Sequence, residues 1–170
     1  VPSGAMVLGL FGWAFIALYT LAFMSTSLLF LAPLLVTLAL KVNALVGIQQ
    51  APSSLALVAG TGALLAMFAN PIFGRMSDRT SSPFGMRRPW MVIGLVGGSL
   101  GILIVALAPN ITILLVGWCI AQVLFNALLA AMVAVLPDQV PIGQRGLTSG
   151  ILGVGMPIAS VIATFLVTLF

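Results

Sequence analysis

The sequence predicts an all-α integral membrane protein with about five transmembrane helices, and its composition carries that prediction. Of its 170 residues, 62% are hydrophobic and only 5% are charged, and the mean hydropathy is +1.31. A soluble core of this size could not bury so much apolar surface, so lipid must be the solvent. Long apolar runs separated by short polar segments then define the individual helices.

The first apolar run covers residues 6–40. At about 1.5 Å per residue a helix of this length exceeds the hydrocarbon layer, yet the run is too short for two spans of about 20 residues each. We therefore expect one long, tilted helix, bent near Pro33, because proline removes a backbone hydrogen bond. Residues 41–51 form the expected connecting loop, and Pro52 suits the first turn of the next helix.

Four further spans are expected, at about residues 53–73, 90–108, 111–136 and 147–170. A tight turn at Pro109 and Asn110 separates the third from the fourth, and polar loops at 74–89 and 137–146 separate the others. Glycines recur on the third span, and their spacing of four residues predicts close packing against another helix. The glycines concerned are Gly94, Gly97, Gly98 and Gly101.

The distribution of Lys and Arg predicts the orientation in the membrane. The 74–89 loop holds four of the six basic residues and one of the two acids, and the 137–146 loop holds Arg145. The opposite side holds only Lys41. By the positive-inside rule both loops and the N-terminus are expected in the cytoplasm, with the protein in the plasma (inner) membrane.

Several functional classes are excluded by the residues that the chain lacks. The net charge of +4 comes from residues that flank membrane spans, so anionic lipid explains it better than nucleic acid. There is no His and a single Cys, Cys119, which leaves no disulfide within the chain and argues against a metal site. No nucleophile–base pair is present, so we expect neither an enzyme nor a bound cofactor.

The segment NPIFGRMSDRTSSPFGMRRPW, residues 70–90, carries a family resemblance. Its pattern Gly-x-x-Ser-Asp-Arg-Thr…Gly-x-Arg-Arg-Pro-Trp resembles the loop between helices 2 and 3 of the major facilitator superfamily. The long form of the loop, with five residues before the second glycine, is most similar to that of sucrose-type and glycoside-cation symporters. The matching positions are Gly74, Asp78, Arg79, Gly85, Arg87 and Arg88. Asp78 is expected to pair with Arg79 or Arg75, or to lie against the positive end of a neighbouring helix.

The resemblance implies two six-helix bundles around a central cavity that opens alternately to each side. This chain would be part of the N-terminal bundle, an incomplete half, with a C-terminal half or a partner subunit missing. Asp138 and Arg145 resemble the family's second cytoplasmic charge cluster. We hypothesise that they join Asp78 and Arg79 in a gate that forms in the outward-facing state and breaks in the inward-facing one. The alternative is a simple loop anchor.

Candidate substrate-binding residues come from two spans. Gln122 and Asn126 are four residues apart and share one helical face. Tyr19 and Thr26 are seven apart and share a face with Phe23. Rings with nearby hydroxyls and amides suit a sugar, and helices 1 and 4 line the cavity in the resembled superfamily. Alternatively, the amides bond another helix and the hydroxyls bond their own backbone four residues back.

The sequence therefore predicts a secondary active transporter, a symporter, for a sugar or a similar polar organic solute. The alternatives are a drug or metabolite efflux carrier of the same superfamily and a membrane assembly protein that does not transport. No acid or His lies within a span, although a proton-coupled carrier needs a titratable group there. The arginine of the drug antiporters' Arg-x-x-Gln-Gly pattern is also missing before Gln122. Coupling then lies in the missing half, or transport is not driven by protons.

Overall fold

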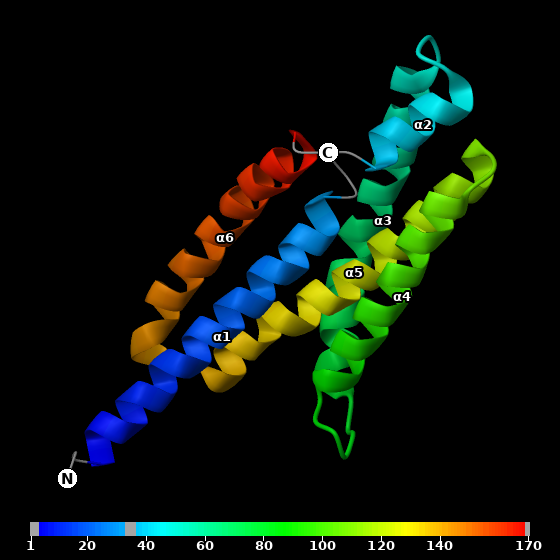
Figure 1. Ribbon diagram of the computed structural model, residues 1–170. Helices are drawn as coiled ribbons and strands as arrows, with labels where there is room; N and C mark the ends of the chain where they lie inside the picture. Colours follow the sequence, from blue (N-terminus) through cyan, green and yellow to red (C-terminus); the bar gives the residue numbers. More distant parts are fainter. Residues whose placement is uncertain (1–3, 33–36, 169–170) are drawn as a thin grey trace. The chain divides into compact units, whose positions relative to one another are not determined.

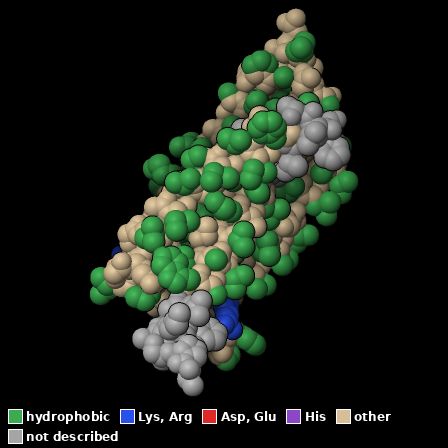
Figure 2. All heavy atoms as spheres, turned by 60° about the vertical axis from the view of Figure 1, so that its left-hand side comes forward, with side chains coloured by type: hydrophobic (Ala, Val, Ile, Leu, Met, Phe, Trp, Pro, Cys, Tyr) green, Lys and Arg blue, Asp and Glu red, His purple; other side chains and the backbone are tan. Residues whose placement is uncertain are grey.

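The computed structural model describes residues 4–32 and 37–168, and these form six helices with no strand among them (Figure 1). They are α1 (Gly4–Ala32), α2 (Leu38–Val46), α3 (Ala51–Arg79), α4 (Arg88–Leu107), α5 (Ile111–Gln139) and α6 (Ile142–Thr168). All except α2 are long and apolar enough to cross a membrane. Hydrophobic side chains are spread over the face shown in Figure 2. The predicted all-α membrane fold is confirmed.

The first apolar run differs from the expected single helix. Helix α1 ends at Ala32, and the bend predicted at Pro33 lies outside the described residues. A separate short helix, α2, occupies residues expected to form the end of the first span and part of the 41–51 loop. The loop prediction was wrong there because Leu38 and Val42, four residues apart, are both fully buried and give α2 an apolar face. Gly47, at φ 77°, ends this helix.

The two loops expected in the cytoplasm are shorter than predicted. Helix α3 continues through Pro71 to Arg79, and α5 continues through Pro137 to Gln139. Residues 80–87 and 140–141 are left as connections, in place of 74–89 and 137–146. Both prolines lie in the later part of a long helix, where a single missing backbone hydrogen bond does not end it.

The described helices divide between two compact units. One comprises Ala32–Val135, with α2, α3, α4 and most of α5; the other comprises Val1–Leu31 and Leu136–Phe170, with α1 and α6.

Glycines bring α4 and α5 into close contact. A Cβ atom built on Gly101 would lie 2.6–2.9 Å from backbone and side-chain atoms of Ala121, and one on Gly98 would meet the ring of Phe125. Gly94 and Gly97 lie in the same way against α5. The close packing predicted from the glycine spacing is confirmed, because no other residue would leave room for this separation of the backbones.

A hydrophobic cluster joins all four helices at one end of this unit. It consists of Leu38, Val42, Val58, Val105, Ala108, Leu114 and Trp118. Helix α2 packs here on α3 and α4. Lys41 of α2 donates a hydrogen bond from Nζ to the carbonyl oxygen of Ala106, 2.8 Å away, in the last turn of α4. A cation at this position also complements the negative end of the helix dipole.

In the other unit, α1 and α6 begin at the same end and run in the same direction (Figure 1). They meet at Gly155, where an added Cβ would lie 3.3 Å from Cγ of Met24. The buried residues of α1 recur every three or four positions and form one stripe. They are Ile16, Tyr19, Thr20, Phe23, Thr26 and Ser27.

Candidate functional site

The connection between α3 and α4 contains an ion pair. Asp78 and Arg87 lie 2.5 Å apart, from Oδ1 to Nη1, and the same Nη1 donates to Oγ of Ser77 at 3.0 Å. Ser77 is fully buried and the Arg87 side chain is 13% exposed, whereas that of Asp78 is 60% exposed. Asp78 does not pair with Arg79 or Arg75; it meets Arg87, the N-cap residue of α4, and so lies at the positive end of a neighbouring helix, as the alternative expects. The chain turns back after α3, and the turn brings Arg87 onto the end of that helix.

The turn itself depends on Gly85. Its φ of 96° lies in the left-handed region, which glycine adopts without the steric cost of a Cβ. The Gly85 N–H donates to the carbonyl oxygen of Ser82 at 3.0 Å, and the Phe84 N–H donates to the Ser82 hydroxyl at 3.2 Å. Gly74, by contrast, has no atom within 4 Å of an added Cβ. Among the described residues, no neighbouring helix therefore packs closely on Gly74.

Trp90 anchors the start of α4 to the end of α3. Its Nε1 donates to the Thr80 hydroxyl at 2.8 Å, and that hydroxyl donates to the carbonyl oxygen of Met76 at 2.7 Å. The ring of Trp90 also packs on Phe73, with centroids 5.4 Å apart. Sequence reasoning did not assign roles to Ser77 and Thr80. The sequence indicates such roles only through the position of Ser77 and Thr80 on either side of Asp78 and Arg79.

The second charge cluster is a helix-end anchor in this structure. Arg145 of α6 donates from Nε to the carbonyl oxygen of Val140 at 2.9 Å and from Nη2 to that of Pro137 at 2.7 Å. Pro137 lies in the last turn of α5 and Val140 directly follows that helix, so the guanidinium caps its end. Asp138 is exposed. Asp78 and Arg79 belong to one unit and Asp138 and Arg145 to the other, and the gate network stays a prediction.

On α5, three polar side chains are buried at intervals of four residues. Trp118 is 2% exposed, Gln122 4% and Asn126 8%. Asn126 donates from Nδ2 to the backbone oxygen of Gln122 at 2.8 Å, so it bonds its own helix. Trp118 Nε1 is buried with no hydrogen-bond partner among the described residues. Trp118 and the Gln122 side chain both pack against Gly62 of α3, where an added Cβ would clash with them.

The three candidates on α1 also lie together, in the other unit. Tyr19, Phe23 and Thr26 are at most 9% exposed, and Tyr19 stacks on Phe15 with ring centroids 6.1 Å apart. The Thr26 hydroxyl donates to the carbonyl oxygen of Ala22 at 2.9 Å, four residues back. This is the backbone bond that the alternative interpretation expects. The candidates thus form an α5 row in one unit and an α1 stripe in the other.

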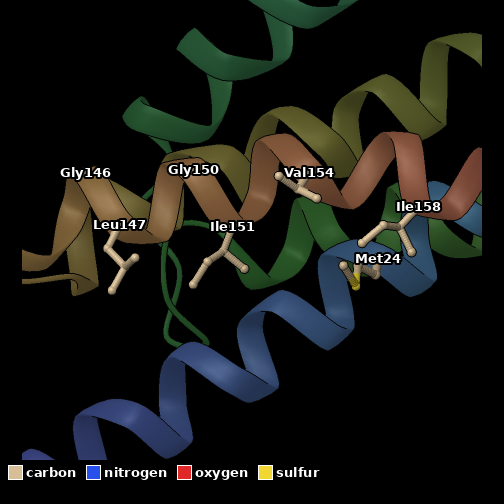
Figure 3. A pocket seen from close by; sticks show the side chains of 7 residues that line it. All are labelled: Met24, Gly146, Leu147, Gly150, Ile151, Val154 and Ile158. Carbon is tan, nitrogen blue, oxygen red and sulfur yellow. The ribbon is translucent and has the colours of Figure 1, made fainter.

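A groove of about 550 Å³ lies between α1 and α6 (Figure 3). The described residues of its lining include no polar side chain, and two of them are glycines whose faces are open. Figure 3 shows Met24 on the α1 side and the other lining residues on α6. They are Gly146, Leu147, Gly150, Ile151, Val154 and Ile158. Such a lining suits an apolar occupant and offers a sugar no hydrogen bond from a side chain.

Comparison with known proteins adds two findings. A family model described as the Major Facilitator Superfamily matches residues 14–170. A segment of 57 residues, 34% of this chain, is 37% identical to the sucrose transport protein SUC4 of Arabidopsis thaliana and covers 10% of the length of that protein. No solved structure matches the chain significantly.

Proposed function

Because the chain belongs to the major facilitator superfamily, whose members are membrane transporters and not enzymes, we propose that it forms part of a secondary transporter for a sugar or a similar polar organic solute. The long α3–α4 motif and the segment that is similar to a sucrose transport protein support this substrate class. That segment covers a small part of the relative, and the assignment of substrate belongs to this proposal.

The buried amide row on α5 is the observation that carries the proposal. An amide inside the hydrocarbon layer is costly unless it has a hydrogen-bond partner or water. Among the described residues, no group forms a hydrogen bond with the side-chain amide of Gln122, although that residue is 4% exposed. Trp118 Nε1, one turn away, likewise lacks an acceptor there. A hydroxyl group of a sugar can satisfy the Gln122 amide, because each hydroxyl donates and accepts. Trp118 Nε1, by contrast, is enclosed in the core cluster against Gly62.

Alternating access needs more helices than the described residues supply. Five helices can cross the membrane. We propose that they form part of the N-terminal bundle and that a further bundle, from a longer chain or a partner subunit, closes the path. The N-terminus lies in the cytoplasm in this proposal, and the membrane is the plasma (inner) membrane. Both acids, Asp78 and Asp138, lie at the ends of helices, so a titratable coupling group belongs to the further bundle or is not used.

The apolar groove of Figure 3 supports a second candidate, efflux of apolar drugs or metabolites. A lining without polar side chains favours such compounds over sugars. The two candidates differ in the residues that matter. Sugar transport depends on Gln122, and efflux through the groove depends on residues such as Ile151.

Sugar counterflow in liposomes tests the proposal. The protein is produced from its own gene with its own termini, its intact mass is measured, and counterflow is recorded with and without a pH gradient. Gln122→Leu should lower counterflow by about fivefold to 150-fold, because a lost hydrogen bond to a buried polar group costs about 1–3 kcal/mol. Gln49→Leu, the same change at an exposed position of the α2–α3 turn, should leave it unchanged.

Two results would count against sugar transport. Wild-type counterflow rates in Gln122→Leu would show that the Gln122 amide does not bind the sugar. Absence of counterflow for every sugar, together with drug transport that Ile151→Trp blocks, would favour the efflux candidate.

A further inference from the structure

One exposed stripe on α3 changes from apolar to basic along its length. Leu65, Phe68 and Ile72 are 39%, 58% and 52% exposed, and the next positions at the same helical spacing are Arg75 and Arg79, both exposed. Intervals of three and four residues place all five on one side of the helix. We call them the α3 stripe. An apolar band that ends in two guanidiniums is complementary to a phospholipid, whose acyl chains are apolar and whose phosphate is negatively charged.

The two arginines of the stripe have no acidic partner. The one acid near this end of α3, Asp78, pairs with Arg87. Among the described residues no hydrogen bond or ion pair involves the guanidinium of Arg75 or Arg79. The two arginines and Met76, which is 44% exposed, line a hollow of about 110 Å³. Two guanidiniums one helical turn apart can both contact one phosphate group.

The length of α3 places the arginines at the depth of lipid headgroups. Its 29 residues span about 44 Å at 1.5 Å per residue. The hydrocarbon core of a bilayer is about 30 Å thick, so the last turns of the helix extend into the headgroup layer. Arg75 and Arg79 lie in these turns, and Phe68 and Ile72 precede them on the hydrocarbon side.

From these observations we propose that the α3 stripe binds one anionic phospholipid. The phosphate lies in the hollow between Arg75 and Arg79, and an acyl chain lies along Ile72, Phe68 and Leu65. Charge complementarity selects an anionic lipid over a zwitterionic one, because the arginines repel the positively charged amine of a zwitterionic headgroup. This lipid is a discrete ligand of the stripe, distinct from the surrounding bilayer.

Native mass spectrometry of the purified protein in neutral detergent tests this proposal. Phosphatidylglycerol and phosphatidylcholine with the same acyl chains are titrated separately. One phosphatidylglycerol should bind with a clearly lower Kd than phosphatidylcholine. Arg75→Gln and Arg79→Gln should each raise that Kd about fivefold, and the double variant should raise it about 25-fold. The double variant Arg75→Lys/Arg79→Lys should retain binding. This result would show that the site tolerates replacement of both arginines and that lipid binding requires their positive charge.

Arg88 provides the matched control. It is exposed at the start of α4, at the same end of the unit, and lies outside the stripe. Arg88→Gln should change the Kd less than twofold. An equal loss in Arg88→Gln would show general attraction of anionic lipid to a basic loop and would overturn the proposal, as would equal binding of the two lipids. Glycerol 3-phosphate, which has no acyl chain, should not compete with phosphatidylglycerol at millimolar concentration. Full competition would show that the acyl chain does not contribute to binding, against the proposal.

Discussion

Gly101 is a position where the α4–α5 contact leaves no room for an added methyl group. The Cβ of an alanine would meet the backbone N and Cα of Ala121 at 2.6 and 2.8 Å, and backbone atoms cannot turn aside as a side chain can. We expect Gly101→Ala to lower the free energy of unfolding by about 1–3 kcal/mol, the usual cost of overpacking. The measurement is the unfolding midpoint by circular dichroism in a series of sodium dodecyl sulfate concentrations.

Gly60 is the control for this substitution. It lies in α3 of the same unit, and an added Cβ there has no atom within 4 Å. Gly60→Ala should leave stability unchanged or raise it slightly, because alanine has the higher helix propensity. A loss in Gly60→Ala as large as in Gly101→Ala would show that the contact with Ala121 is not the cause.

Asp78 is the residue where a structural and a gating role can be separated. Asp78→Asn removes the charge that faces Arg87 but leaves the hydrogen bond from Arg87 to Ser77 available. The pair is largely exposed on the Asp78 side, so stability should fall by no more than about 1 kcal/mol. If the ion pair belongs to the proposed gate, transport in liposomes should fall far more than expression does. Equal losses in both would favour the loop anchor.

At the scale of an element, Lys41 links α2 to the end of α4. Its ammonium group donates to the carbonyl oxygen of Ala106, a helix-end acceptor, and complements the helix dipole. Lys41→Met keeps the length of the side chain and removes the charge and the donor. We expect the free energy of unfolding to fall by about 0.5–1.5 kcal/mol. The measurement is the thermal unfolding midpoint in detergent.

Lys41→Arg is the matched variant, because it keeps a cation at the same helix end. It should retain most of the stability that Lys41→Met loses. If both variants are equally destabilised, the aliphatic contacts of Lys41 matter more than its charge. If neither is, the bond to Ala106 contributes nothing to the docking of α2.

The elements differ in how far the sequence could predict them. The long helices follow from apolar runs, since a chain in lipid must satisfy its backbone within each segment. The ends of α3 and α5 were placed too early because the residues from Gly74 and from Pro137 onward were assigned to polar loops, although both helices continue into them. Helix α2 was missed because a loop was expected directly after a single long span, and its short apolar face is defined by contacts with other helices.

At the scale of the whole molecule, the candidate site was predictable in kind but not in its pairings. A buried amide row on α5 could be predicted, because Gln122 and Asn126 interrupt an otherwise apolar span. The partner of Asp78 could not, because it depends on the turn at Gly85 that returns the chain to α3. The same turn pairs Asp78 with Arg87, so no carboxylate in the described part of the chain pairs with Arg75 or Arg79, and the lipid proposal depends on this structural detail.

The orientation in the membrane decides which leaflet supplies that lipid. Five basic residues flank the α3–α4 and α5–α6 connections, and one, Lys41, lies at the other end of the helices. The positive-inside rule then places the α3 stripe arginines at the cytoplasmic leaflet. Two cysteine substitutions in a Cys119→Ala background test this. The sites are Asn43 and Ser81, which are both exposed. Ser81 is chosen over the neighbouring Ser82 because the Ser82 hydroxyl accepts a hydrogen bond from the Phe84 N–H, which a cysteine would disturb.

A membrane-impermeant maleimide added to intact cells should label Asn43→Cys and leave Ser81→Cys unlabelled until the membrane is permeabilised. The reverse pattern would invert the topology and place Arg75 and Arg79 at the outer leaflet. Labelling of both sites in intact cells would mean that the chain inserts in two orientations. In that case charge bias alone would not fix the topology, and a single cytoplasmic lipid site could not serve every copy.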